Sequence, residues 1–198
     1  GRRFSYRELD ATVSSIAAGL EAHGVKAGDR VALFLANRWE FLAGVLACLR
    51  LGALAVPIGT RQRATELEFL INDCSASVII FEADLAEMLP AAADIPTIRH
   101  RFSVGGQVPG AQGFEALLGR TDRVPAAAAT EEDAAVILYT SGTTGRPKGA
   151  LLTHLGMIHS ALTFARCCHL TERDRCIVAV PLSHVTGLVG VSLATMVV

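Results

Sequence analysis

The sequence predicts an α/β fold in which parallel sheets are flanked by helices. Up to Phe81, short apolar runs alternate with segments whose apolar residues recur at helical spacing. This alternation is typical of parallel strands joined by right-handed helical crossovers. The chain has 198 residues, of which 51% are hydrophobic. It can therefore build one sizeable core or two small lobes in contact.

The first helix is expected from Ser5 to Gly19. Ser5 can act as its N-cap, and Glu8 completes the Ser-x-x-Glu pattern of a capping box. Apolar residues then follow at helical spacing, and His23-Gly24 ends the helix.

The next elements continue the alternation. Each expected strand is a short apolar run, and Asn37 is the expected N-cap of the second helix. In chain order we expect a strand at Arg30–Leu35, a helix from Arg38 to about Leu51, a strand at Leu54–Ile58, a helix at Glu66–Asn72 and a strand at Ser77–Phe81.

The chain is expected to divide into three regions. Residues 1–104 form a first α/β lobe, and residues 105–132 connect it to residues 133–198. In the connecting region glycine, proline and alanine accumulate without a clear period, with room for a short helix at Phe114–Leu118. In the last region we expect a helix from Thr153 to about Cys168 and a strand at Cys176–Val180.

The segment Tyr139–Gly149 (YTSGTTGRPKG) has the composition of a polyphosphate cradle. It follows an apolar run, Ala134–Tyr139, that is typical of a strand buried on both faces. Its glycines allow successive backbone N–H groups to converge on an anion, and its hydroxyls and single lysine add donors and charge. The residues that we expect to contact phosphate are Thr140, Ser141, Gly142, Thr143, Thr144, Gly145 and Lys148.

A flexible solvated linker is the simplest alternative for this loop, but it would not need the upstream strand or the Pro-Lys-Gly exit. Lys26 and Lys148 are the only lysines in the chain, so a lysine is less expected to occur in the loop by chance than it would be in a lysine-rich sequence. No Gly-Lys-Ser/Thr follows the spaced glycines, which excludes a Walker A loop.

In this loop and in several other segments, the chain resembles the AMP-forming acyl-CoA synthetases, a branch of the adenylate-forming ligases. The resemblance is strongest at the loop and includes Phe4–Asp10, Gly28–Val31 and Leu51–Ala53. It implies that all three regions are part of one domain, the large N-terminal domain of that fold. It also implies that Thr140 to Gly145 and Lys148 hold the ATP phosphates while a carboxylate attacks the α-phosphorus, releasing pyrophosphate. The acyl-adenylate would then form a thioester with CoA.

A second cluster, Pro181–Gly187, follows the last expected strand, and ligands of open α/β sheets collect beyond the carboxyl ends of strands. A lone histidine there is more often structural than functional. The resemblance favours function, because acyl-CoA synthetases carry a Pro-Leu-x-His segment that lines the acyl pocket. It therefore implies that His184 shapes the acid pocket and acts beside Lys148 in catalysis. Ser183 stands where the family often has an aromatic residue, so the acid is not identified.

The resemblance also implies parts beyond Val198: the acidic residue that holds Mg²⁺, an aspartate on the ribose and a mobile domain with an adenylation lysine. No metal ligand is therefore assigned within this chain. ATP, Mg²⁺ and CoA are the implied cofactor and co-substrates, and the 198 residues alone are expected to be inactive.

Two other functions remain open from the residues. One is an amidase-type hydrolase in which Ser141 is the nucleophile and Lys148 the base. The other is a non-catalytic nucleotide-binding or interaction module.

Composition narrows the partners and the location. The net charge is −1 and there is no basic tract, so the sequence does not predict nucleic-acid binding. No apolar segment has the length and pattern of a transmembrane helix or a signal peptide. Five cysteines without C-x-x-C spacing predict buried thiols in a reducing, cytoplasmic setting. The expected partners are small molecules, and a homodimer is left open.

Overall fold

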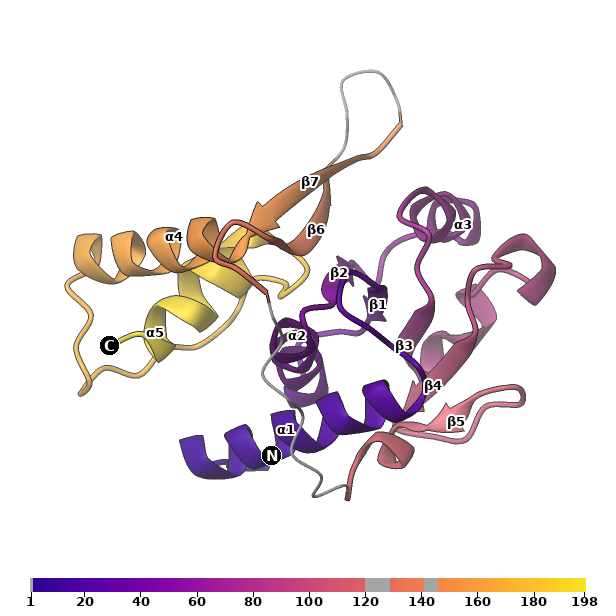
Figure 1. Ribbon diagram of the computed structural model, residues 1–198. Coiled ribbons are helices and arrows are strands. Elements are labelled where there is room, and N and C mark those ends of the chain that lie inside the picture. The colour runs from indigo at the N-terminus through magenta and orange to yellow at the C-terminus, as the bar shows by residue number, and fades with distance from the viewer. Residues whose placement is uncertain (1, 120–128, 141–145) are drawn as a thin grey trace.

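A computed structural model describes residues 2–119, 129–140 and 146–198, which form a seven-stranded sheet with helices on its faces (Figure 1). The strand order is β5-β4-β3-β1-β2-β6-β7, and every neighbouring pair is parallel except β6 and β7. The predicted α/β class is confirmed. The strands are β1 Arg30–Phe34, β2 Leu54–Ile58, β3 Val78–Glu82, β4 His100–Val104, β5 Gln112–Gly113, β6 Ala134–Thr140 and β7 Lys148–Thr153.

Helices cover both faces of the sheet, and two further ones lie beside the β6–β7 hairpin (Figure 1). The α-helices are α1 Tyr6–Ala22, α2 Trp39–Leu51, α3 Ala64–Asp73, α4 His154–Cys167 and α5 Ala194–Met196. A π-helix, η4 Thr186–Leu193, precedes α5, and three 3₁₀ segments are η1 Ala83–Met88, η2 Ala92–Asp94 and η3 Phe114–Leu117. No described helix is long and apolar enough to cross a membrane.

The strand β1 shows how the sheet separates two apolar cores. Val31 and Leu33 belong to a large core that also takes in α1 and α2, whereas Ala32 and Phe34 belong to a smaller core under α3. Side chains alternate between the faces of a strand, so a continuous apolar run is what a strand covered on both faces needs.

Two helix starts follow the expected capping chemistry. The Glu8 backbone N–H donates to Ser5 Oγ at 3.2 Å, and the Ser5 N–H donates to Glu8 Oε2 at 2.7 Å, which completes the predicted capping box. Thr153 caps α4, where its Oγ1 accepts from the Gly156 N–H at 3.1 Å.

Two expectations about secondary structure were wrong. Asn37 does not cap α2, because the N-cap position is Arg38 and no side chain caps it. Residues 176–180 form no strand, and Ile177 is 90% exposed. This segment is held by hydrogen bonds from the Asn37 side chain instead of by a strand ladder.

The cysteines also differ from expectation. All five thiols are free, but only Cys48 and Cys74 are buried, whereas Cys167, Cys168 and Cys176 are exposed. The latter three lie at the end of α4 and in the unpaired segment after it, where little of the chain covers them.

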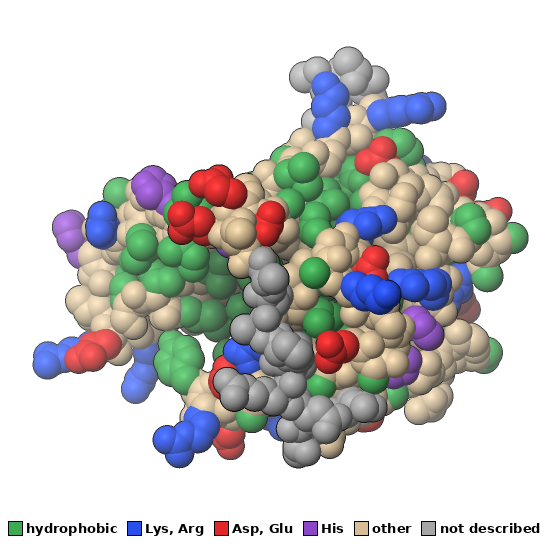
Figure 2. Space-filling model, viewed as in Figure 1, with side chains coloured by type: hydrophobic (Ala, Val, Ile, Leu, Met, Phe, Trp, Pro, Cys, Tyr) green, Lys and Arg blue, Asp and Glu red, His purple; other side chains and the backbone are tan. Residues whose placement is uncertain are grey.

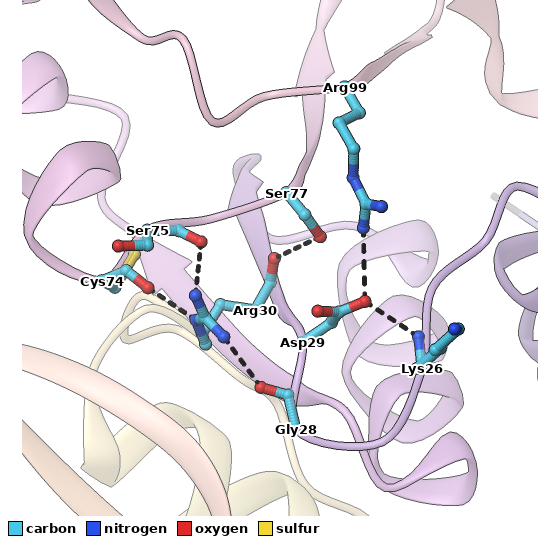
Figure 3. Close-up of polar contacts among 8 residues, drawn as sticks. All are labelled: Lys26, Gly28, Asp29, Arg30, Cys74, Ser75, Ser77 and Arg99. Atoms are coloured by element: carbon cyan, nitrogen blue, oxygen red, sulfur yellow. Dashed lines mark hydrogen bonds and ion pairs between the residues drawn. The ribbon is translucent and has the colours of Figure 1, made fainter.

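The amino ends of the central strands are tied together by Arg30 (Figure 3). Its Nε donates to the carbonyl of Cys74 at 2.6 Å, and its two terminal nitrogens donate to the carbonyls of Ser75 and Gly28 at 2.7 and 3.0 Å. Ser75 has a left-handed φ of 50°, a conformation that a non-glycine residue adopts only when its surroundings hold it. Arg30 therefore fixes the turn between α3 and β3.

Replacing Arg30 with alanine is expected to lower the free energy of unfolding by about 2–3 kcal/mol, because three carbonyls lose a charged donor. Urea denaturation measures this. Arg99→Ala is the matched control, since Arg99 is 52% exposed and makes one 3.3 Å contact with Asp29 (Figure 3). It should cost less than about 1 kcal/mol. Equal losses in the two variants would contradict the role given to Arg30.

Candidate functional site

The loop predicted to hold phosphate joins β6 to β7, and the hairpin projects from the body of the molecule (Figure 1). Thr140 and Lys148 are directly opposite each other in the antiparallel pair, so they frame the two ends of the loop. Both are exposed, and no ion pair of the described residues involves Lys148. Figure 2 shows Lys and Arg side chains beside the grey tip of the hairpin. Ser141 to Gly145 lie outside the described residues.

The carboxyl ends of β1, β2 and β6 meet beside this hairpin. They line a cavity of about 480 Å³ together with part of the Pro181–Gly187 cluster. Its wall contains Asn37 after β1, Gly59 after β2 and Tyr139 near the end of β6. The location agrees with the rule that parallel α/β sheets bind ligands beyond the carboxyl ends of their strands.

A second cavity, of about 360 Å³, adjoins the first through Tyr139, Pro181, Ser183 and His184. Its lining includes both Thr140 and His184. The structure therefore brings together the base of the loop and the histidine of the second cluster, which lie 44 residues apart in the sequence. Both cavities share the Pro181–His184 wall.

That wall is fixed from two directions. Leu182 is 5% exposed and packs in the large core, and its backbone N–H donates to Asn37 Oδ1 at 2.8 Å. The His184 N–H donates to the carbonyl of Pro181 at 3.1 Å, which turns the chain into η4. The imidazole of His184 thus stands on a short turn anchored by a buried leucine.

Tyr139 ties the base of the loop to α3. Its hydroxyl donates to Asp73 Oδ2 at 2.6 Å and lies 3.5 Å from the carbonyl of Leu70. Burial of the ring, followed by the hydrogen bond to the Asp73 carboxylate, raises the pKa of the Tyr139 phenol above its ordinary value of about 10. The phenol is therefore a donor throughout the physiological range.

This shift predicts a pH dependence of stability. The unfolded phenol ionises near pH 10 and the folded one only at higher pH, so its contribution is present below about pH 10 and is lost as pH rises above it. In Tyr6→Phe, where Tyr139 is the only tyrosine, phenolate absorbance should appear at higher pH in the folded than in the unfolded protein. Tyr139→Phe should remove that part of the alkaline loss of stability. A phenol titrating alike in both states would contradict this.

The charges of the site suit an anion. None of the residues lining the two cavities is acidic, while Thr140, Thr60 and Arg61 offer donors and Lys148 adds a cation at the loop. These residues fit the phosphates of ATP. For Mg²⁺, the described part of the chain contains no group of three His, Cys, Asp or Glu side chains that could hold a metal ion.

The predicted site residues are thus partly placed. Thr140 and His184 line the smaller cavity, and Lys148 pairs with Thr140 without lining either cavity. Ser141, Gly142, Thr143, Thr144 and Gly145 fall outside the described residues. Sequence reasoning missed Asn37 as part of the site, and it placed Tyr139 at the start of the loop without giving its side chain a role. The available signal was position, because each lies at the carboxyl end of an apolar parallel strand.

Comparison with known proteins identifies the family to which the chain belongs. The sequence pattern described as AMP-binding enzyme matches residues 1–198. A long-chain-fatty-acid–CoA ligase, FadD13, from Mycobacterium tuberculosis is 35% identical and is matched over 98% of this chain and 38% of its own length. A feruloyl-CoA synthase from an Amycolatopsis species is also 35% identical, over 99% of this chain and 38% of the relative. The chain thus spans about 38% of the length of these curated relatives.

Solved structures agree with the fold. The anthranilate CoA ligase AuaEII in complex with anthranoyl-AMP superposes with a TM-score of 0.91 at 26% identity, over 98% of this chain and 38% of that one. ATP-bound MatB from Rhodopseudomonas palustris gives a TM-score of 0.86 at 30% identity, over 99% and 39% of the two chains. One of these relatives therefore binds an acyl-adenylate and the other ATP.

Proposed function

The chain belongs to the AMP-binding enzyme family, and we propose that the full-length protein is an AMP-forming carboxylate–CoA ligase. It would join a carboxylic acid to AMP with release of pyrophosphate and pass the acyl group to CoA. The observation that carries the proposal is that Thr140 and His184 line one cavity beside the carboxyl ends of the strands, with Lys148 paired opposite Thr140 in the β6–β7 hairpin.

In this proposal the β6–β7 hairpin binds the phosphates. Lys148 supplies a point charge and Thr140 a hydroxyl donor, and the residues between them, Ser141 to Gly145, complete the cradle. Charge grows on the departing pyrophosphate as the carboxylate attacks, and a cation fixed near it stabilises that transition state more than the ground state. Mg²⁺ supplies further charge neutralisation when bound.

The acid would occupy the space beside the Pro181–His184 wall. The cavity there mixes apolar walls, among them Ile58 and Leu70, with donors at Thr60 and His184. An imidazole offers either an N–H donor or a flat apolar face, so it suits a place where a carboxylate meets the start of an acyl chain. Ser183 in this wall leaves more room than an aromatic residue would.

The relatives favour this function over the two alternatives. FadD13 and the feruloyl-CoA synthase are acid–CoA ligases, and no relative described above is an amidase. A serine hydrolase would use Ser141 as nucleophile, so lack of labelling of Ser141 by an acyl fluorophosphonate is the expected result.

The test is acid-dependent exchange of pyrophosphate into ATP by the full-length protein, measured over a panel of fatty, aromatic and short-chain acids. We expect exchange with at least one acid and thioester formation when CoA is added. The 198 residues alone should give no exchange. Absence of exchange by the full-length protein across the panel would refute the ligase.

A further inference from the structure

The side chain of Asn37 makes three hydrogen bonds to one distant segment of backbone. Its Nδ2 donates to the carbonyls of Val178 and Val180 at 3.1 and 2.9 Å, and its Oδ1 accepts from the Leu182 N–H at 2.8 Å. Asn37 follows β1, and its partners lie 141 to 145 residues further along the chain. Every donor hydrogen and the acceptor oxygen of the amide are thereby occupied.

We propose that Asn37 is a positioning residue for the acid pocket, and this inference rests on the ligase function proposed above. Residues 178–182 pair with no strand in the described part of the chain, so the Asn37 amide provides hydrogen bonds that a strand ladder would otherwise supply. The next residues, Ser183 and His184, line both cavities. Asn37 therefore sets where this wall stands relative to the loop.

The orientation of the amide is fixed by its partners. Turning it over would place the carbonyl oxygen of the side chain against two backbone carbonyls and the NH₂ group against the Leu182 N–H. Only one arrangement satisfies all three bonds, so Asn37 specifies one position of the segment. Aspartate keeps the acceptor for Leu182 but brings a charge against both carbonyls. Leucine keeps the approximate volume and loses every bond.

The location separates this role from phosphate binding. Thr140 and Lys148 are held by the β6–β7 backbone pair, whereas the hydrogen bonds of the Asn37 side chain go to Val178, Val180 and Leu182. Releasing residues 178–182 moves the wall that carries His184 but leaves the β6–β7 pair and Lys148 in place. The acid should therefore be affected more than the nucleotide.

The experiment uses the full-length protein and the acid that gives the highest exchange rate. In Asn37→Ala and Asn37→Leu we expect the KM for the acid in pyrophosphate exchange to rise about ten-fold or more, from the loss of three hydrogen bonds. The KM for ATP should stay within about two-fold, and backbone amides of residues 178–184 should exchange with deuterium faster. Asn37→Asp should retain protection at the Leu182 amide.

Asn72→Ala is the matched control, because Asn72 is also exposed and donates one hydrogen bond to a distant carbonyl, that of Asp94 at 2.7 Å. It should leave both KM values and the exchange of residues 178–184 unchanged. An unchanged KM for the acid in Asn37→Ala, or equal rises for acid and ATP, overturns the proposal. If the wild-type protein exchanges no pyrophosphate with any acid, the proposed ligase function is refuted instead. In that case deuterium exchange still tests the role of Asn37, because unaltered exchange of residues 178–184 in Asn37→Ala would show that Asn37 does not anchor this segment.

Discussion

Replacing Lys148 with alanine in the full-length protein is expected to reduce acid-dependent pyrophosphate exchange by about 10²- to 10³-fold. Lys148 begins β7 directly opposite Thr140, and no described residue pairs with its ammonium group. Its charge is thus available to a phosphate. Because the proposed role is strongest when charge builds on pyrophosphate, the rate should fall further than ATP affinity, which we expect to weaken about ten-fold.

Lys26→Ala is the natural control, because it removes the only other lysine. Lys26 lies in the turn before β1, where its backbone N–H donates to Asp29 at the amino end of the sheet (Figure 3). This variant should keep full exchange activity. Lys148→Arg should retain part of the activity, since it keeps the charge in a larger, planar group. Unaltered exchange and ATP affinity in Lys148→Ala would remove the basis for the phosphate site.

The strands of the central sheet could be predicted because their signal is local. Continuous apolar runs such as Leu54–Ile58 occur where a parallel strand is covered on both faces, and this range matches β2. The strand β4, which lies between β3 and the two-residue strand β5, was missed, because His100 and Arg101 are partly exposed and interrupt the apolar pattern. Cys176–Val180 was over-predicted for the opposite reason, since apolar composition alone does not supply a pairing partner.

Only the motifs of the site could be predicted from the sequence, and not how they come together. The glycine loop and the Pro-Leu-Ser-His segment each stand out in sequence, but their meeting depends on where the strands end in space. Asn37 illustrates the limit. An asparagine just before a helix is ordinarily read as an N-cap, and a contact with residues more than 140 positions away leaves no local trace.

Gly187→Ala is expected to lower the free energy of unfolding by about 3 kcal/mol and to abolish most exchange activity. A Cβ at Gly187 would overlap the carbonyl oxygen of Pro181 and lie 2.8 Å from its carbonyl carbon and 3.0 Å from the Val180 oxygen. These are backbone atoms, so the strain cannot be relieved by rotating a side chain. Either η4 unpacks from the large core, or the wall carrying His184 moves outward.

Gly190→Ala is the matched control for the collision at Gly187. Gly190 lies in the same helix, so replacing it with alanine changes the helix propensity by the same amount without bringing a Cβ against backbone atoms. Its Cβ would approach atoms of the Phe164 ring at 3.2 Å, and this side chain is 42% exposed and free to shift. We expect a change below about 1 kcal/mol and nearly full activity. Thermal unfolding and pyrophosphate-exchange kinetics of the two variants test this difference. If they behave alike, the close approach of Gly187 to Pro181 does not set the position of the wall, and the acid pocket must be held by other contacts.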